Sequence, residues 1–227
     1  MNKIKNYQEI INSKIEKIRI QGTPNELYDP INYILNLKSK RVRPILSLLS
    51  YSLFKEDIDK ITEPAIALEF FHNFTLIHDD IMDNADIRRG EDTIHKKWNN
   101  NIGILAGDLL MIFAYKMLEN VEAKTFKKTF QRYNNIAVKV CEGQQYDMNF
   151  EVENEISEDD YLKMITLKTA VLIGFSLELG GLIANKEKLI TDQLYIAGEN
   201  FGISFQLMDD YLDVFGSAEF GKKIGGD

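Results

Sequence analysis

Two clusters of aspartates, DDIMD at 79–83 and DDYLD at 209–213, have the side chains and the spacing to bind divalent cations. In each cluster the first and last aspartates are four residues apart, so on a helix they share one face with Cβ atoms about 5–6 Å apart. Like charges at this spacing repel each other, and a hard, oxygen-seeking cation relieves the repulsion. A single acidic cluster is as often a solvated helix end. Two clusters of the same spacing, each after an apolar stretch, favour Mg²⁺ binding together with phosphate oxygens.

Basic residues that can bind anions accompany the first cluster. Lys40 and Arg43 are three residues apart, so they can hold one anion from one helix face. Arg88 and Arg89 directly follow the first cluster, and His72 precedes it by seven residues, about 10.5 Å along the same helix face. Each has an ordinary alternative: a solvated basic turn, a pair with neighbouring acids, or a core histidine. Their occurrence together favours anion binding.

Lys168 stands alone in an apolar stretch, because it is the only basic residue between Met164 and Ala184. A lysine in such a helix needs an anion partner, unless its long side chain reaches the surface.

The elements that position these residues are predicted to be helices. All four prolines lie at or before Pro64, and apolar residues recur at three- and four-residue spacing, without the alternation of strands. Ser157 and Asp160 form a predicted capping box. We expect one all-α domain over residues 1–227, a bundle of long helices. The predicted helices are 2–20, 26–37, 43–54, 60–84, 100–119, 123–150, 157–184 and 189–215.

Composition excludes several other classes of protein. The net charge of −8 and pI of about 5.1 argue against nucleic-acid binding. The single cysteine, Cys141, allows no internal disulfide, which fits a cytoplasmic setting. The stretch from Thr169 to Ala184 is short for a membrane span and contains Glu178, so we expect a buried helix and no stable membrane insertion.

Taken in order, several stretches resemble the motifs of trans-isoprenyl diphosphate synthases. HDDIMDNADIRRG and FQLMDDYLDVFG resemble the two aspartate-rich motifs of that family. A third motif of the family is GKRxRP, and here Ser39 stands in place of its glycine. The remaining matches are SKRVRP at 39–44, GQQYD at 143–147, LKT at 167–169 and GKKIGGD at 221–227.

The resemblance implies a prenyltransferase of the isoprenoid synthase fold, in which long helices surround a central apolar cavity. The family joins isopentenyl diphosphate head to tail to an allylic prenyl diphosphate, with Mg²⁺ as cofactor and usually as a homodimer. Family members continue with further helices, so we expect this chain to lack the C-terminal part of the bundle. Two alternatives stay open: a non-catalytic subunit of a heteromeric synthase, and a terpene cyclase.

The resemblance also implies a role for each matching residue. The expected Mg²⁺ ligands are Asp79, Asp83 and Asp209, with Asp80, Asp210 and Asp213 completing the catalytic clusters. The expected contacts to the allylic diphosphate, with Lys168 also counted as catalytic, are Arg88, Lys168, Thr169, Gln206 and Lys222. The expected isopentenyl diphosphate pocket consists of Lys40, Arg43, His72 and Arg89.

Product length is expected to depend on two residues that lie about one helical turn before the first aspartate cluster. In this family, side chains five and four positions before that cluster form the floor of the chain pocket. Here they are Phe74 and Thr75, one large and one small. This combination resembles synthases with a C20 product, so we expect C20 first and C15 next.

Overall fold

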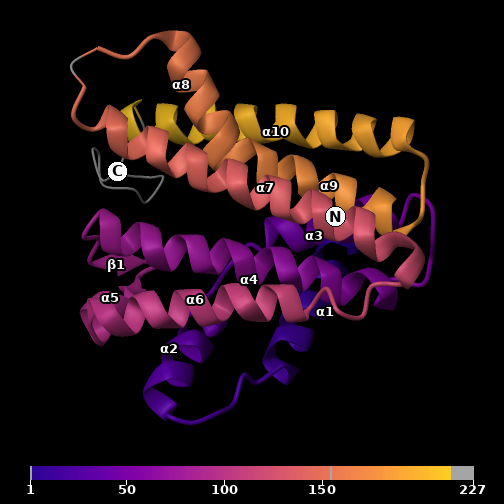
Figure 1. Cartoon of the computed structure of the whole chain (residues 1–227), viewed down its shortest axis with the longest axis horizontal. Helices are drawn as coiled ribbons and strands as arrows, with labels where there is room; N and C mark the ends of the chain where they lie inside the picture. The colour runs from indigo at the N-terminus through magenta and orange to yellow at the C-terminus, as the bar shows by residue number, and fades with distance from the viewer. Residues whose placement is uncertain (1, 154, 216–227) are drawn as a thin grey trace. The chain divides into compact units, whose positions relative to one another are not determined.

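The computed structural model describes residues 2–153 and 155–215 and shows an all-α protein (Figure 1). This confirms the predicted fold class. The chain divides into two compact units, Met1–Phe126 and Lys127–Asp227. The expectation of a single domain over 1–227 stays a prediction, and each unit is described by itself.

The first unit is built around one buried helix. Its elements are α1 (Asn2–Lys17), α2 (Asn25–Asn36), α3 (Val42–Tyr51), α4 (Asp59–Met82), β1 (Ile87–Arg88), β2 (Glu91–Asp92), α5 (Ile94–Lys97) and α6 (Asn100–Lys116). Every residue from Pro64 to Phe71 in α4 is buried, and α4 packs beside α6 and α3 (Figure 1). Because α4 is surrounded along this stretch, it has no polar face there. Its C-terminal end is less buried, and this end carries the first aspartate cluster.

The second unit also contains a largely buried helix, α9 (Val171–Ile183). It contains most of α7 (Ala123–Phe150), then α8 (Glu158–Ile165), the π-helical turn η1 (Thr166–Ala170), α9 and α10 (Lys188–Phe215). Ser157 caps α8, accepting a hydrogen bond from the Asp160 backbone N at 3.1 Å, as predicted. Helix α10 packs along α9, where Gly198 and Gly174 meet with no room for a side chain.

Among the described residues, one stretch is apolar and long enough to cross a membrane, Glu158–Ile183. Its most apolar window is 78% buried within the fold, as in the core helix of a folded domain. Glu178 within this stretch is paired with Arg132, whose Nε lies 2.7 Å from the carboxylate. The stretch is therefore a core helix, as the sequence predicted.

Candidate functional site

Asp80, in the first aspartate cluster, is held by the protein itself. Its side chain is 2% exposed, and its Oδ1 atom accepts hydrogen bonds from Arg88 Nε at 2.9 Å and Nη2 at 2.6 Å. Burial raises the pKa of Asp80, although the hydrogen bonds from Arg88 oppose the shift. Asp80 thus fixes the Arg88 guanidinium beside the cluster.

Asp79 and Asp83 are the more accessible carboxylates of this cluster. The Asp79 side chain is 17% exposed, with Arg88 Nη2 3.8 Å from its Oδ2 atom, and Asp83 is exposed at the end of α4. Asp79 lies in the last turn of α4, and Asp83, four residues later, is its C-cap residue. Two carboxylates suffice for Mg²⁺, which completes its shell with water and substrate phosphate. Across the described residues, no three carboxylate, imidazole or thiol groups gather closely enough to hold a metal ion.

A tight hairpin aims the two arginines that follow. Strands β1 and β2 pair antiparallel, with Arg88 opposite Glu91, and the two turn residues Arg89 and Gly90 have φ of +58° and +83°. Positive φ at both turn positions is the type I′ geometry that matches strand twist and favours glycine. The hairpin returns Arg88 to Asp80 and brings Arg89 Nη1 to 3.3 Å from Asn73 Oδ1.

A second basic group, of Arg43, His72 and Arg89, gathers beside the middle of α4. Burial lowers the pKa of His72 well below its ordinary range, and the nearby charges of Arg43 and Arg89 lower it further. His72 is therefore neutral at pH 7. Burial also lowers the pKa of Arg43 to about 10, opposed by the charge of Glu69. The Arg43 Nε atom is buried and has no hydrogen-bond partner among the described residues. An anion would satisfy it.

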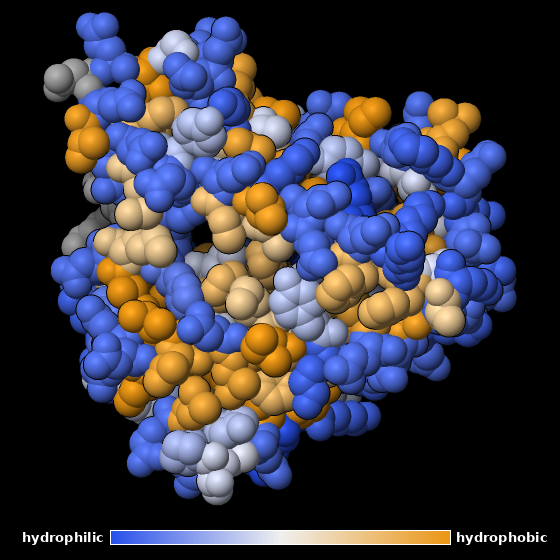
Figure 2. All heavy atoms as spheres, in the orientation of Figure 1, coloured by the Kyte–Doolittle hydropathy of each residue, from blue (hydrophilic) through white to orange (hydrophobic). Residues whose placement is uncertain are grey.

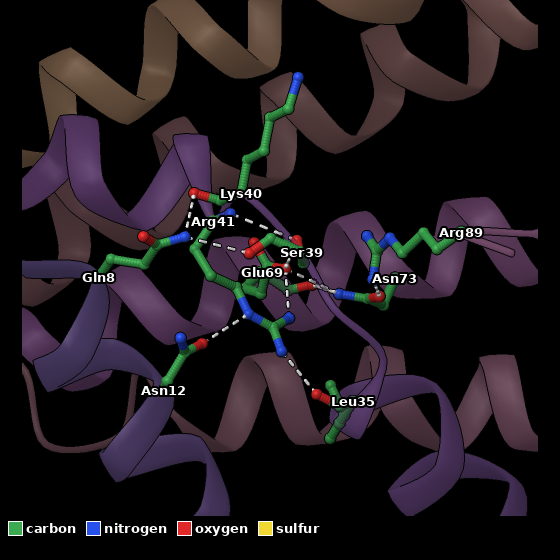
Figure 3. Close-up of polar contacts among 9 residues, drawn as sticks. All are labelled: Gln8, Asn12, Leu35, Ser39, Lys40, Arg41, Glu69, Asn73 and Arg89. Atoms are coloured by element: carbon green, nitrogen blue, oxygen red, sulfur yellow. Dashed lines mark hydrogen bonds and ion pairs between the residues drawn. The ribbon is translucent and has the colours of Figure 1, made fainter. Parts of the chain in front are cut away.

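Lys40 is less closely tied to this group. It is exposed, and its ammonium projects away from the other side chains drawn in Figure 3. In the part of the chain that the structure describes, no carboxylate lies within ion-pair distance of it. A long, unpaired lysine at the edge of the group can reach an anion that enters from solvent.

The second unit places Lys168 and Thr169 in the π-helical turn η1. Such turns are rare and often occur at functional sites. Gly143 permits it, because a Cβ there would lie 2.2 Å from the Lys168 backbone N. The Lys168 ammonium is 2.5 Å from Asp147 Oδ2, so the glycine and aspartate of the GQQYD motif both act on the same lysine.

The second aspartate cluster is linked to this turn by hydrogen bonds. Thr169 Oγ1 donates to Gln206 Oε1 at 2.9 Å, and Gln206 Nε2 donates to Asp210 Oδ1 at 2.7 Å. The Tyr161 hydroxyl donates to the other oxygen of Asp210. Asp210 therefore supports the cluster, while Asp209 and Asp213, four residues apart on α10, are half-buried.

The two residues expected to set product length lie on α4 and contact neighbouring residues of the same helix. Phe74 packs edge-on against the His78 ring at 4.8 Å between centroids and lies 5.5 Å from the Phe71 ring. Thr75 Oγ1 donates to the His72 carbonyl at 2.8 Å. Lys222 lies outside the described residues.

Sequence reasoning assigned no role to several residues around these groups, chiefly Glu69, Asn73, Arg41, Tyr161 and Asp147, although Arg41 and Asp147 lie within motifs that it identified. A signal existed for Glu69, since a lone carboxylate within the apolar run from Ala65 to Phe71 requires a buried partner. No comparable signal marked Tyr161, whose partner Asp210 is 49 residues away.

The comparisons with known proteins identify the family that the chain resembles. The family model described as polyprenyl synthetase matches residues 24–227. A geranylgeranyl pyrophosphate synthase of Geoglobus acetivorans is 38% identical over 226 residues, which cover 99% of this chain and 71% of that protein. A geranylgeranyl diphosphate synthase of Methanosarcina mazei is 35% identical over 228 residues, covering 100% of this chain and 70% of that protein.

The fold comparison points the same way. A crystal structure of a geranylgeranyl pyrophosphate synthase superposes with a TM-score of 0.96 at 45% sequence identity, and the match covers 100% of this chain and 70% of that one.

Proposed function

The chain belongs to the polyprenyl synthetase family, and on that premise we propose that it condenses isopentenyl diphosphate with an allylic prenyl diphosphate to make a short-chain product, C20 first. The relatives named geranylgeranyl diphosphate synthases support this assignment. C15 remains the next candidate for the product.

The observation that carries the proposal is the presence of two groups in the first unit, each of which we propose to hold one diphosphate, the first of them by way of Mg²⁺. One consists of Asp79, Asp83 and Arg88 at the end of α4. The other consists of the mutually close residues Arg43, His72 and Arg89. A condensation needs two diphosphates, whereas a terpene cyclase ionises one, so the second group favours the synthase. Intact aspartates in both clusters favour an enzyme over a non-catalytic subunit.

Mg²⁺ is the proposed cofactor, held by Asp79 and Asp83 in the first unit and by Asp209 in the second. Their carboxylate oxygens are the ligands that this ion prefers. Bound there, Mg²⁺ would neutralise diphosphate charge and so make the diphosphate a better leaving group.

The residues of the chain bind, orient and shield the reactants in this proposal. In the first unit, Arg88 is a proposed contact to the allylic diphosphate, and Lys40, Arg43, His72 and Arg89 are the proposed contacts to isopentenyl diphosphate. In the second unit, taken by itself, Lys168, Thr169 and Gln206 are proposed contacts to a diphosphate. Fixed positive groups stabilise the charge that develops on the leaving diphosphate. The isopentenyl double bond then attacks the allylic carbon, and the released pyrophosphate takes the proton. No protein nucleophile is needed.

The direct test is to incubate the chain with isopentenyl diphosphate, labelled farnesyl diphosphate and Mg²⁺, and to separate products by chain length. We expect a C20 product. Products formed from the allylic substrate alone would instead support a cyclase. Binding of both substrates without product would support a non-catalytic subunit.

Shortening the proposed floor residue should lengthen the product. In Phe74→Ala the loss of the ring, which packs against His78, opens space near the end of α4. We expect products at least one C5 unit longer, with the rate of the first condensation changed less than about threefold because no diphosphate contact is lost. Chain-length analysis after full turnover measures this. An unchanged product in Phe74→Ala would exclude Phe74 as the floor.

A homodimer is the proposed assembly, as the resemblance implies, and a cytoplasmic location remains a proposal. Hydrophobic side chains gather over α6 in Figure 2, and Ile104, Leu105 and Ile112 are 44%, 57% and 50% exposed. We expect Leu105→Lys to convert a dimer into a monomer in light scattering, because a charge at an interface core is costly. Val138→Lys, an equally exposed site at 58%, is the control and should leave the assembly unchanged.

A further inference from the structure

Glu69 is a buried carboxylate on α4, and three donors converge on one of its oxygens (Figure 3). Its side chain is 2% exposed, and Oε1 accepts from Arg41 Nη1 at 2.7 Å, Asn73 Nδ2 at 3.2 Å and Ser39 Oγ at 3.4 Å. A buried carboxylate is tolerated only when paired in this way. None of the roles assigned above involves Glu69.

Arg41 is wholly occupied by the protein. Its Nε donates to Asn12 Oδ1 at 3.2 Å and its Nη2 to the Leu35 carbonyl at 2.6 Å, in addition to the pair with Glu69. Its backbone has a φ of +50°, which is strained for a residue with a side chain. The buried guanidinium therefore fixes the start of α3, where Arg41 is the N-cap residue.

Asn73 connects the same carboxylate to Arg89. Its side chain is fully buried, and Nδ2 donates to the Glu69 carbonyl at 2.7 Å as well as to Oε1. With the amide nitrogen held by Glu69, the amide oxygen must face Arg89, from which it accepts a hydrogen bond at 3.3 Å. The hydrogen bond defines the direction of the Arg89 guanidinium.

We propose that Glu69 and Asn73 are positioning residues that preform the isopentenyl diphosphate pocket. Through Arg41, Glu69 fixes the start of α3, which carries Arg43, and through Asn73 it orients Arg89. Without this carboxylate, the positive charges of Arg41 and Arg89 would repel each other. The incoming diphosphate would then have to assemble the pocket itself. This inference rests on the proposed function, because it names the substrate of that same pocket.

The test compares both substrates in Asn73→Ala. We expect the KM for isopentenyl diphosphate to rise about tenfold, the scale of a hydrogen bond to a charged group, and the KM for farnesyl diphosphate to change less than about twofold. In an Arg89→Ala background, Asn73→Ala should add nothing, since its action passes through Arg89. Glu69→Gln, which keeps the shape and removes the charge, should have the larger effect.

Glu178→Gln is the matched control, because it removes the charge from another buried carboxylate paired with an arginine, in the second unit. It should lower the melting temperature without changing the ratio of the two KM values. An equal rise of both KM values in Asn73→Ala, or an additive effect with Arg89→Ala, would reduce the role of Asn73 to stability and overturn the inference.

Calorimetry with isopentenyl diphosphate alone separates this inference from the proposed function. If the chain binds it without making product, the proposed synthase activity fails, yet Asn73→Ala should still weaken binding about tenfold. If the unmodified chain does not bind isopentenyl diphosphate, the pocket and its positioning residues are both excluded.

Discussion

Asp79→Asn is expected to lower turnover by about a thousandfold while leaving the fold intact. The amide keeps the size of the side chain but removes the negative charge that a bound Mg²⁺ needs, and a metal ion contributes several kcal/mol to such a reaction. Each loss of about 1.4 kcal/mol is a factor of ten in rate. Because the Asp79 side chain is partly exposed, the substitution leaves no buried charge unpaired. Product formation from labelled isopentenyl diphosphate measures the effect.

The Mg²⁺ dependence of the residual activity is the more specific readout. We expect the Mg²⁺ concentration at half-maximal rate to rise in Asp79→Asn. Asp86→Asn is the matched control, since Asp86 is 77% exposed and pairs only at the surface, with Lys96 at 2.8 Å. It should stay within about twofold of the unmodified chain, because exposed ion pairs contribute little. A loss of activity in Asp79→Asn with an unchanged Mg²⁺ requirement would contradict the metal role.

The helices were predictable because their signals are local. The expected helices at 60–84, 100–119 and 123–150 appear as Asp59–Met82, Asn100–Lys116 and Ala123–Phe150. The expected helix at 157–184 appears as α8, η1 and α9 in succession. Periodic apolar residues and a capping box indicate where a helix runs, and they leave its ends uncertain by a few residues.

The hairpin and the π-helical turn could not be predicted in the same way. The stretch at 88–93 reads as a polar connection, and only the positive φ values of Arg89 and Gly90 make it a type I′ turn. The π-helical turn depends on Gly143, which lies on another helix and leaves room for the Lys168 backbone. Its cause is a tertiary contact, which the local sequence of the turn does not contain.

The candidate site also contains residues with local sequence signals and residues whose roles depend on distant partners. Residue types and motif order indicated candidate anion-binding side chains, whose roles stay predictions, and the structure places Arg43 and Arg89 near His72. The residues that hold them, such as Glu69 and Asn73, are spread over the apolar core of α4 and resemble ordinary core positions until their partners are known. Partners from distant segments decide such roles.

Lys168→Gln should reduce kcat/KM for the allylic diphosphate by about a hundred- to a thousandfold, the usual effect of removing one fixed donor from a developing anion. The π-helical turn and Gly143 hold the Lys168 backbone in place, and Asp147 Oδ2 holds its ammonium at 2.5 Å. This pair is only partly buried, at 28% and 26% exposure. The ammonium can therefore shift to a diphosphate without leaving a fully buried carboxylate unpaired.

Lys163→Gln is the control from the neighbouring helix, because Lys163 is exposed and its ammonium contacts Tyr146, lying 2.7 Å from the hydroxyl and 4.3 Å from the ring centroid. It should change kcat/KM less than about twofold, as exposed substitutions away from a site do. Steady-state kinetics at saturating isopentenyl diphosphate, together with melting temperatures, separate catalysis from folding. If Lys168→Gln lowers the melting temperature but leaves kcat/KM near that of Lys163→Gln, the pair with Asp147 stabilises η1 and has no part in binding the diphosphate.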